Sequence, residues 1–452
     1  MRWLVILEDV LPFFFLTACS NQPEDAIVSR WEPAEVVVAV VIDTMASHRM
    51  RSETVPNIEG FFSDNGVWVP QVLATRGLTS VATASLLTGL YPRRHGIRSN
   101  AGWSATELPT LITQFNDAGY HTVGLSANAC QFIESTDESV CTWSQTYPHD
   151  RLTDRDQWLL DALPAALDTR PSDQPLFLWV HLISPHQPYR PVEPYFSELL
   201  PDGNTSTIDP GNEALLGDLV LGRQEMSGDD LERIRAAYDS RVRSADESFK
   251  SILDALEERG LLSEAVVMLG SDHGESLGSS GDYLFHGCSP NTDVLQVSFG
   301  MSAPGRLPAG QTVSGWVSQV ELGPTLADVA GIGWRGPRDG DTLADAFISG
   351  EAPRRPVYAE RSERTATIVD GDWAYVLNPD QDFAGCSPFS EADPYRTASE
   401  SLFHLSEDPQ SANNLITTEP EQAAALKDTL CTWLRDGRWS HQINNPLLKS
   451  CR

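Results

Sequence analysis

The sequence predicts an α/β fold built around a mostly parallel sheet, and three segments carry this prediction. Residues 35–43 read EVVVAVVID, a nearly continuous β-branched run that is typical of a strand buried on both faces. Residues 175–186 (PLFLWVHLISPH) and 265–276 (AVVMLGSDHGES) repeat the pattern and end in polar residues. Because these strands alternate with helical segments, we expect residues 35–42, 176–182 and 265–270 to lie inside one large sheet.

Helices are expected between these strands. Residues 82–92 (ATASLLTGLYP) predict one helix that Gly89 and Pro92 stop, and Thr79 or Ser80 is expected to cap its start. A long amphipathic helix is expected over residues 229–262, with room for one break. Further helical segments are VPNIEGFFSDNGV (55–67), the first part of LPTLITQFNDAGYHTVGLSAN (108–128), which then becomes a strand, and SQVELGPTLADVAGI (318–332).

The pattern changes at about residue 350. The segment RPVYAERSERTATIVDGDWAYVLNP (355–379) alternates short strands and turns, and a helix is expected over EPEQAAALKDTLCTWLRDG (419–437). We therefore predict a small antiparallel sheet with a closing helix. The predicted organisation is a signal peptide at 1–19, a catalytic domain at 20–350 and a C-terminal α+β subdomain at 351–452.

The charge balance limits the partners of the protein. The chain has 452 residues with 32 basic and 63 acidic side chains, a net charge of −31. Such a surface repels nucleic acid, so no nucleic-acid partner is expected. Solubility and source composition are the simplest explanation of the charge, and nothing in the sequence indicates the oligomeric state.

The N-terminus predicts export. Residues 1–22 (MRWLVILEDVLPFFFLTACSNQ) combine one Arg, a short apolar run and LTAC, a pattern typical of a bacterial lipoprotein signal in which Cys19 is lipidated. An ordinary signal peptide or a wrongly chosen start codon is the alternative. The run is too short to span a membrane, so membrane contact is expected only through the lipid. The expected location is a bacterial cell envelope, on the periplasmic or outer-membrane face.

Six cysteines remain after Cys19. An even number in an exported chain suits disulfides, and none of them has zinc-binding CxxC spacing. We favour disulfides between cysteines that lie close together in the sequence. The two cysteines that then remain would join distant segments. The three predicted bridges are Cys130–Cys141, Cys431–Cys451 and Cys288–Cys386.

Polar residues follow the predicted buried strands at the edge where α/β proteins bind ligands. Asp43 follows the first strand, and Asp272 and His273 follow another; carboxylate and imidazole groups are metal ligands. Thr79 heads a helix behind Gly77, where free N–H groups and the helix dipole favour an anion. Single residues of this kind are often caps or core residues. Their gathering at one edge predicts a metal and anion site.

The stretches that contain these candidate residues, together with further stretches along the chain, resemble the sulfatase family of the alkaline phosphatase superfamily. They follow the family's order from about residue 35 to 415, and ASLLTGLYPRRHG and SDHGE are the specific ones. The resemblance implies an alkaline-phosphatase-like α/β/α sandwich and ester hydrolysis. The stretches are VVIDT, VPNIEGFFSDNGV, ASLLTGLYPRRHG, AGYHTVGLSAN, HLISPHQPY, YDSRVRSAD, VVMLGSDHGESLG, FHG, SQVELGPTLADVAGI and LFHLSEDPQSANNL.

The chain departs from the family pattern where the nucleophile forms. Family sulfatases carry Cys-x-Pro-x-Arg at the head of the catalytic helix, and this Cys becomes formylglycine; here Thr79 stands in its place and Thr83 replaces the Arg. Thr44 stands at the position where the family carries a second consecutive Asp. The Lys and His that many arylsulfatases carry after the GY turn are absent, and Ser126 and Asn128 stand nearby.

The resemblance implies one divalent metal ion, Ca, Mn, Zn or Mg, held by Asp43, Thr79, Asp272 and His273. Thr79 is then expected to be an unmodified nucleophile, as in superfamily transferases where a metal-bound Thr attacks phosphorus. A histidine is expected to protonate the leaving alcohol.

The candidates for that role are His286 and His186, with His181 as a weaker one; His95 and Arg76 are read as structural and solvated, respectively. The expected substrate is an anionic sulfate or phosphate ester of a small molecule, glycan or lipid. Two other functions stay open: a Thr-nucleophile phosphotransferase that modifies an envelope lipid or glycan, and a catalytically inactive envelope-binding lipoprotein.

Overall fold

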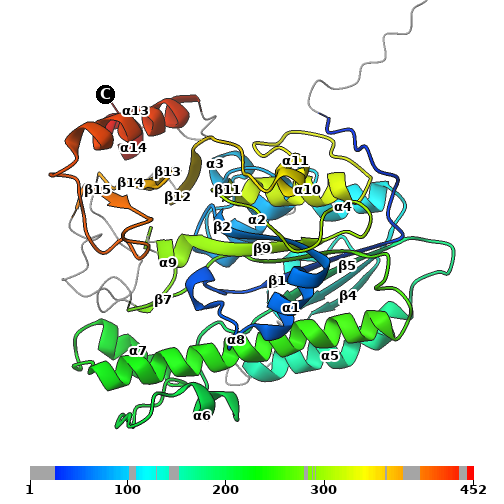
Figure 1. Cartoon of the computed structure of the whole chain (residues 1–452), viewed down its shortest axis with the longest axis horizontal. Helices are drawn as coiled ribbons and strands as arrows, with labels where there is room; N and C mark the ends of the chain where they lie inside the picture. Colours follow the sequence, from blue (N-terminus) through cyan, green and yellow to red (C-terminus); the bar gives the residue numbers. More distant parts are fainter. Residues whose placement is uncertain are drawn as a thin grey trace, which may run out of the picture.

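A nine-stranded mixed sheet forms the centre of the molecule (Figure 1). The computed structural model describes residues 26–100, 108–128, 130–141, 152–278, 284–287, 289–290, 292–361, 364–379, 398–436 and 445–451. The strand order is β10-β2-β9-β6-β1-β5-β3-β4, and β11 also pairs with β2. The strands are β1 (Val36–Ile42), β2 (Gly66–Leu73), β3 (His121–Ser126), β4 (Glu138–Cys141), β5 (Leu176–Leu182), β6 (Val266–Ser271), β9 (Gln296–Ser302), β10 (Gln311–Thr312) and β11 (Val317–Ser318).

The middle of the sheet is parallel and buried on both faces. β1 pairs in parallel with β5 and β6, while β9 runs antiparallel to its neighbours. Every residue of β1 is buried; Val38 and Val40 pack into one apolar cluster, and Val37 and Val41 into another on the opposite face. The predicted strands at 35–42, 176–182 and 265–270 are thereby confirmed as members of the large sheet.

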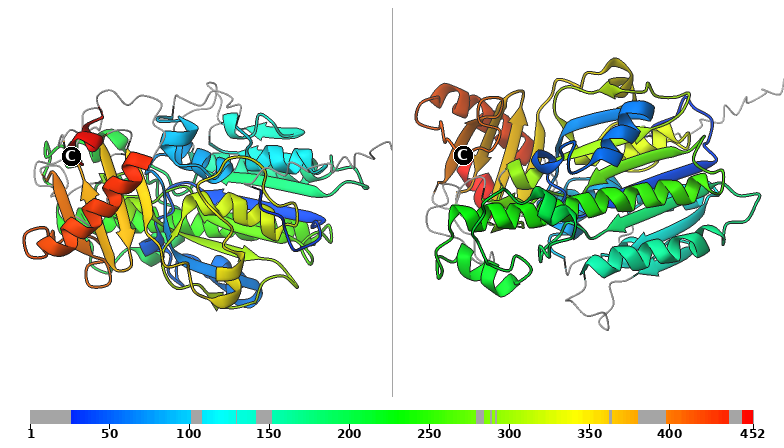
Figure 2. Two further views of the ribbon diagram at one scale, coloured as in Figure 1. Left: turned by 90° about the horizontal axis from the view of Figure 1, so that it is seen from above. Right: turned by 60° about the horizontal axis from the view of Figure 1, so that its bottom comes forward.

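Helices cover both faces and complete the predicted α/β/α sandwich (Figures 1 and 2). The long helix α8 (Gly228–Glu257) is unbroken over 30 residues and begins at a capping box formed by Ser227 and Asp230. It shares its face with α1 (Pro56–Asn65), α5 (Leu152–Leu167), α6 (Tyr195–Leu199) and α7 (Glu213–Val220). The other face carries α2 (Thr79–Thr88), α4 (Leu111–Asp117), α10 (Leu322–Val329) and α11 (Ala344–Ser349).

A separate four-stranded antiparallel sheet follows, as predicted. Its consecutive strands are β12 (Val357–Arg361), β13 (Thr365–Asp370), β14 (Trp373–Leu377) and β15 (Glu400–His404). One face packs under α13 (Pro420–Asp436) and α14 (Pro446–Ser450), and the other packs on a cluster that includes Leu73, Leu295 and Trp316 of the main body. Figure 2 shows the small sheet beside the large one. Both faces of the small sheet are therefore buried.

Short elements connect these layers. They are α3 (Pro92–His95), α9 (Thr292–Leu295), the two-stranded β7 (Ser276–Leu277) and β8 (Leu284–Phe285), and 3-10 turns at Ser47–Arg49, Cys130–Phe132 and Gln319–Glu321.

Two of the predicted disulfides are confirmed. Cys130 bonds to Cys141 beside β4, and Cys431 bonds to Cys451 between α13 and the end of α14. The signal segment 1–19 with Cys19, and the predicted partners Cys288 and Cys386, lie outside the described residues. Within the described ranges, no helix combines the length and the apolar character that crossing a membrane would require.

Candidate active site

Adjacent parallel strands bring the predicted metal ligands together. β1 ends at Ile42 directly before Asp43, and β6 ends at Ser271 directly before Asp272 and His273. Ile42 pairs with Ser271, so the residues that follow them meet at the same sheet edge. All three side chains are fully buried, and one ligand atom of each lies within 4.8 Å of the others.

Thr79 faces this cluster from α2. Its Oγ1 lies 3.5 Å from Asp43 Oδ2 and 3.4 Å from His273 Nε2. Our expectation that Thr79 or Ser80 caps the helix is wrong: the N-cap residue is Leu78, without a side-chain cap, and Thr79 is the first helical residue. The hydroxyl is turned toward the buried acid and imidazole, so capping does not explain its position.

The electrostatics of the cluster fit a divalent cation. Burial, and then the negative charges of Asp272 and Glu275, raise the pKa of Asp43 well above its usual value. Asp43 Oδ1 and Asp272 Oδ2 are buried without a hydrogen-bond partner among the described residues. Unpaired buried carboxylate oxygens are costly, and a metal ion would satisfy both of them.

His273 has the protonation state that a ligand needs. Burial lowers its pKa to about 4, against the opposing effect of Asp272, so the ring is neutral at neutral pH. Its Nδ1 lies 2.9 Å from the carbonyl oxygen of Gly274, and a carbonyl can only accept. The proton therefore sits on Nδ1, and the lone pair of Nε2 faces Thr79 and the two carboxylates.

Two side chains that position these groups were not among the predicted site residues. Asn128 Nδ2 donates a hydrogen bond to Asp43 Oδ2. Gln319 Nε2 donates to the carbonyl oxygen of Asp272 at 2.6 Å, and Gln319 Oε1 accepts from the Thr75 amide at 3.1 Å. Asn128 follows β3 at the same sheet edge, a signal present in the sequence. Gln319 comes from the 3-10 turn before α10; it lies in the family-like stretch 318–332, but its local pattern assigns it no role at the site.

The candidate acid residues have opposite pKa shifts. His286 Nδ1 lies 3.0 Å from Glu275 Oε1; burial lowers the pKa of His286, but the Glu275 charge and hydrogen bond outweigh burial, and the pKa is raised overall. Burial and then the charge of His286 hold the pKa of His186 well below its usual value. The His286 ring centroid lies 4.6 Å from that of His273 and 5.0 Å from that of His186. His286 is thus the ring that favours a proton.

The other histidines and the arginine considered from the sequence make contacts elsewhere in the fold. His181 is fully buried, with its ring 5.6 Å from that of Phe132, and burial lowers its pKa to about 4. His95 is buried against Ser85, its Nε2 lying 3.1 Å from the Ser85 hydroxyl. Arg76 is not simply solvated, because its Nη2 donates to the carbonyl oxygen of Gly287 at 2.6 Å.

The backbone is constrained beside Asp43. Thr44 has a φ of 59°, a conformation that is rare for a β-branched residue. Its amide donates to Asp272 Oδ1 at 3.1 Å, and the Tyr238 hydroxyl donates to its carbonyl oxygen at 2.5 Å. These hydrogen bonds hold the turn after β1 in this conformation, and the first of them links Thr44, the neighbour of Asp43, to the Asp272 carboxylate.

The known proteins to which this chain is similar include sulfatases and a phosphonate monoester hydrolase. The sulfatase family model matches residues 35–332. An arylsulfatase of Clostridium perfringens is 24% identical over 463 residues, covering 86% of this chain and 90% of the relative. A choline-sulfatase of Rhizobium meliloti is 23% identical over 395 residues, covering 74% of each chain. The solved phosphonate monoester hydrolase of Agrobacterium radiobacter superposes with a TM-score of 0.69 at 18% identity, covering 90% of this chain and 96% of that one.

Proposed function

This chain belongs to the sulfatase family and is an ester hydrolase, and we propose that it cleaves sulfuric or phosphoric esters with Thr79 as the nucleophile. The observation that carries the proposal is the position of the Thr79 hydroxyl. It stands at the start of α2, within 3.5 Å of Asp43 and 3.4 Å of His273.

The buried cluster supplies what a threonine hydroxyl lacks at neutral pH. Asp43, Asp272 and His273 would hold a divalent ion, with Thr79 beside them. Such an ion lowers the pKa of a neighbouring hydroxyl and polarises an ester oxygen. The oxygen and imidazole donors suit Ca, Mg, Mn or Zn, and the imidazole favours Mn or Zn.

The protein's own groups then account for bond making and breaking. Thr79 Oγ1 releases its proton to solvent and forms a bond to the sulfur or phosphorus atom, while the bond from that atom to the leaving alcohol breaks. The N-terminal end of α2 stabilises the negative charge that develops on the ester oxygens. Water hydrolyses the Thr79 ester in a second step. Transfer to an acceptor alcohol instead of water would make the protein a phosphotransferase.

His286 is the proposed general acid. Burial lowers its pKa, but the charge and hydrogen bond of Glu275 outweigh burial and raise the pKa overall, which favours the protonated ring that a general acid needs. His186 lies beside it with a lowered pKa and is assigned to substrate contact as a neutral ring.

The substrate is proposed to be an anionic ester of a small molecule, glycan or lipid. The family match and the sulfatases named among the relatives support a sulfate ester. The fold is shared with a phosphonate monoester hydrolase, and for this reason phosphorus esters are also tested as substrates. The signal-like residues 1–22 support a lipid-anchored location in a bacterial envelope.

Thr79 variants test the proposal. Rates of wild type, Thr79→Ala and Thr79→Ser are measured with 4-nitrophenyl sulfate, 4-nitrophenyl phosphate and bis(4-nitrophenyl) phosphate. We expect Thr79→Ala to remain folded while its kcat falls by about three orders of magnitude or more, and Thr79→Ser to keep partial activity. Ser227→Ala is the control, since it removes a helix cap at a cost of about 1 kcal/mol and leaves kcat intact.

Each result has a defined meaning. An Ala variant that keeps most of the wild-type rate would remove Thr79 from the mechanism. Absence of wild-type turnover on every substrate, with the metal bound, would favour the inactive binding protein. Product transfer to added alcohols in preference to water would favour the phosphotransferase.

A further inference from the structure

A buried set of hydrogen bonds connects α2 to the end of β6. Its members are His95, Ser85, Thr75 and Gln319, and we call them the positioning network. His95 is 5% exposed, and the other three side chains are fully buried. Buried polar side chains that bond to one another hold a defined geometry, because breaking one bond leaves a buried group without a partner.

The network begins at His95, the last residue of α3. The Ile97 amide donates to His95 Nδ1 at 3.1 Å, so this nitrogen carries no proton. Burial, followed by the charge of Arg98, lowers the pKa of His95 to about 3, and the ring is therefore neutral at neutral pH. The ring proton must then sit on Nε2, which lies 3.1 Å from Ser85 Oγ and donates to it.

Thr75 is the junction of the network. Its Oγ1 donates to Ser85 Oγ at 2.8 Å, and Ser85 belongs to the same helix as Thr79. Its amide donates to Gln319 Oε1 at 3.1 Å, and Gln319 Nε2 donates to the carbonyl oxygen of Asp272 at 2.6 Å. Thr75 thus links the helix that begins with Thr79 to one of the predicted metal ligands.

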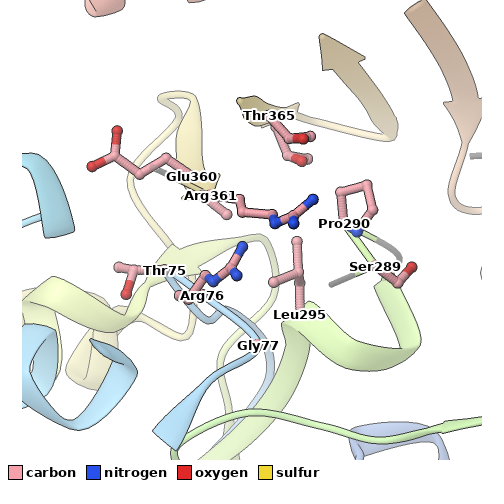
Figure 3. A pocket seen from close by; sticks show the side chains of 11 residues that line it. Thr75, Arg76, Gly77, Ser289, Pro290, Leu295, Glu360, Arg361 and Thr365 are labelled. Atoms are coloured by element: carbon pink, nitrogen blue, oxygen red, sulfur yellow. The ribbon is translucent and has the colours of Figure 1, made fainter. Parts of the chain in front are cut away.

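The second sheet holds Thr75 from the other side. The Glu360 amide donates to the Thr75 carbonyl oxygen at 3.0 Å. Figure 3 shows both residues where the two sheets meet, among the side chains that line a pocket with only about 10 Å³ of space, room for about one water molecule. A Cβ atom at Gly77 would lie 2.3 Å from a side-chain atom of Val294. The loop that leads to Thr79 is therefore closely packed and has little freedom to move.

We propose that the positioning network sets the distance between the Thr79 hydroxyl and the predicted metal ligands, so that its four members are positioning residues for the site. Thr79 Oγ1 lies 3.4 Å from His273 Nε2, and a displacement of about 1 Å at a reacting group can cost about a hundredfold in rate. The inference rests on the proposed function, because it concerns the same site. It gives His95, which has no chemistry of its own there, a role that acts through Ser85 and Thr75.

A matched pair of variants at Thr75 separates hydrogen bonding from packing. Thr75→Val keeps the shape of the side chain but removes the hydroxyl, whereas Thr75→Ser keeps the hydroxyl but removes a methyl group. On the ester that wild type hydrolyses fastest, we expect kcat to fall about tenfold or more in Thr75→Val and to stay within about twofold in Thr75→Ser. A role in packing alone predicts the opposite order, because the methyl group would then matter more than the hydroxyl.

Gln319→Met removes the hydrogen bond to the Asp272 carbonyl oxygen and keeps a side chain of similar size. We expect the affinity for Mn²⁺ and Zn²⁺, measured by titration calorimetry, to fall about tenfold, and kcat to fall about tenfold to a hundredfold, as for other groups that orient metal ligands by hydrogen bonds. The control is Thr122→Val. Thr122 is also fully buried, and its hydroxyl donates to Asn116 Oδ1 at 2.7 Å, but it lies at the beginning of β3, away from the carboxyl edge. This variant should melt at a lower temperature, with kcat and metal affinity unchanged.

Nitrogen-15 NMR of the histidine rings tests the direction of the network without an activity measurement. The protein is labelled at its histidine nitrogens with Zn²⁺ present, and the His95 signals are identified by their loss in His95→Gln. We expect a proton on His95 Nε2 and none on Nδ1 from pH 5 to 8, both in wild type and in Thr79→Ala. A proton on Nδ1, or a ring that titrates in this range, would overturn the network.

The outcomes separate this inference from the proposed function. Unchanged kcat in Thr75→Val, a larger loss in Thr75→Ser, or unchanged metal affinity in Gln319→Met would each overturn the positioning network, even if Thr79 is the nucleophile. If wild type hydrolyses none of the esters, the metal affinity of Gln319→Met, compared with that of Thr122→Val, decides the inference by itself. A Thr79→Ala variant that keeps the wild-type rate would remove the nucleophile but leave that comparison valid. A wild-type protein that binds neither metal ion would overturn both proposals.

Discussion

The carboxyl edge of the large sheet and the seam between the two sheets are neighbours, but they are built in different ways. At the edge, the candidate side chains Asp43 and Asp272 directly follow a strand, and Thr79 begins a helix. At the seam, Arg76 and Arg361 come from segments 285 residues apart that belong to no common motif. The difference shows that the edge can be anticipated from the order of strands and helices along the chain, whereas the seam exists only because the second sheet packs on the first.

The electrostatics of the two regions differ as well. The edge gathers buried carboxylates, two oxygens of which lack a hydrogen-bond partner among the described residues, whereas the seam is lined by the guanidinium groups of Arg76 and Arg361.

Removal of an edge ligand is expected to have the largest effect. Asp272→Ala should lower kcat/KM by about three orders of magnitude or more, because the proposed metal site loses one of three clustered donors and a hydrogen bond to the Thr44 amide. Elemental analysis should show about one metal ion per chain in wild type and a large loss in the variant. Equal metal content in both would remove Asp272 from the site. Arg361→Gln should keep full metal content, which separates edge from seam.

A titrating group at the seam is expected to give the protein a pH-dependent stability. Burial raises the pKa of Glu360 to about 7, against the opposing effect of Arg93, from its usual value of 4.5. Because the Glu360 pKa is higher in the folded state than in the unfolded chain, the proton on Glu360 stabilises the folded state. This contribution to the free energy of unfolding is complete below pH 4.5 and is lost as pH rises through 7. The loss would be about 3 kcal/mol, since a tenfold difference in proton affinity between the folded and unfolded states corresponds to roughly 1.4 kcal/mol.

Denaturant titration at several pH values checks this expectation. Glu360→Gln should flatten the fall in the free energy of unfolding between about pH 5 and 7.5. A fall as steep as that of wild type would show that another group titrates. Glu400, an acid in the small sheet whose pKa is lowered overall, is the control, and Glu400→Gln should not flatten the fall in that range.

The two observed disulfides allow a matched comparison of the two regions. Cys431–Cys451 closes a separation of 20 residues next to the small sheet, and Cys130–Cys141 closes 11 residues beside the edge. Loop-closure entropy predicts a loss of about 3 kcal/mol for either pair on replacement by serine.

The effects on activity should differ between the pairs. Cys141 Sγ lies 3.7 Å from the carbonyl oxygen of Asn128, whose side chain contacts Asp43, so loss of the first pair should also reduce kcat. Replacement of Cys431 and Cys451 should leave kcat on a monoanionic ester nearly unchanged. The same kcat loss in both double variants would mean that the small sheet supports the edge directly.

Helix caps are expected to give the smallest effects. The Asn445 side chain caps α14 next to the small sheet, and Thr110 caps α4 on the large one. Replacement of either by alanine should cost about 1 kcal/mol. If the two sheets unfold as one cooperative unit, both variants should shift a single melting transition; two transitions that respond to different variants would show that the regions unfold separately.

Local sequence patterns determined the large sheet and most of the edge. β-branched runs mark strands buried on both faces, and residues that follow parallel strands meet at one edge, so Asp43, Asp272 and His273 could be placed together from the sequence alone. The two local disulfides and the small sheet were also predictable, because the paired cysteines and the paired strands are close in sequence.

The tertiary structure decided what depends on distant segments and on burial. It placed Leu78 rather than Thr79 at the helix cap and turned the Thr79 hydroxyl toward the acids. The opposite pKa shifts of His286 and His186 follow from Glu275 and from burial, which no periodicity encodes. The meeting of Arg76 with Arg361 follows from how the second sheet packs on the first. Short-range patterns specify which side chains reach a sheet edge, but the charge and hydration of each group depend on neighbours that only the folded chain provides.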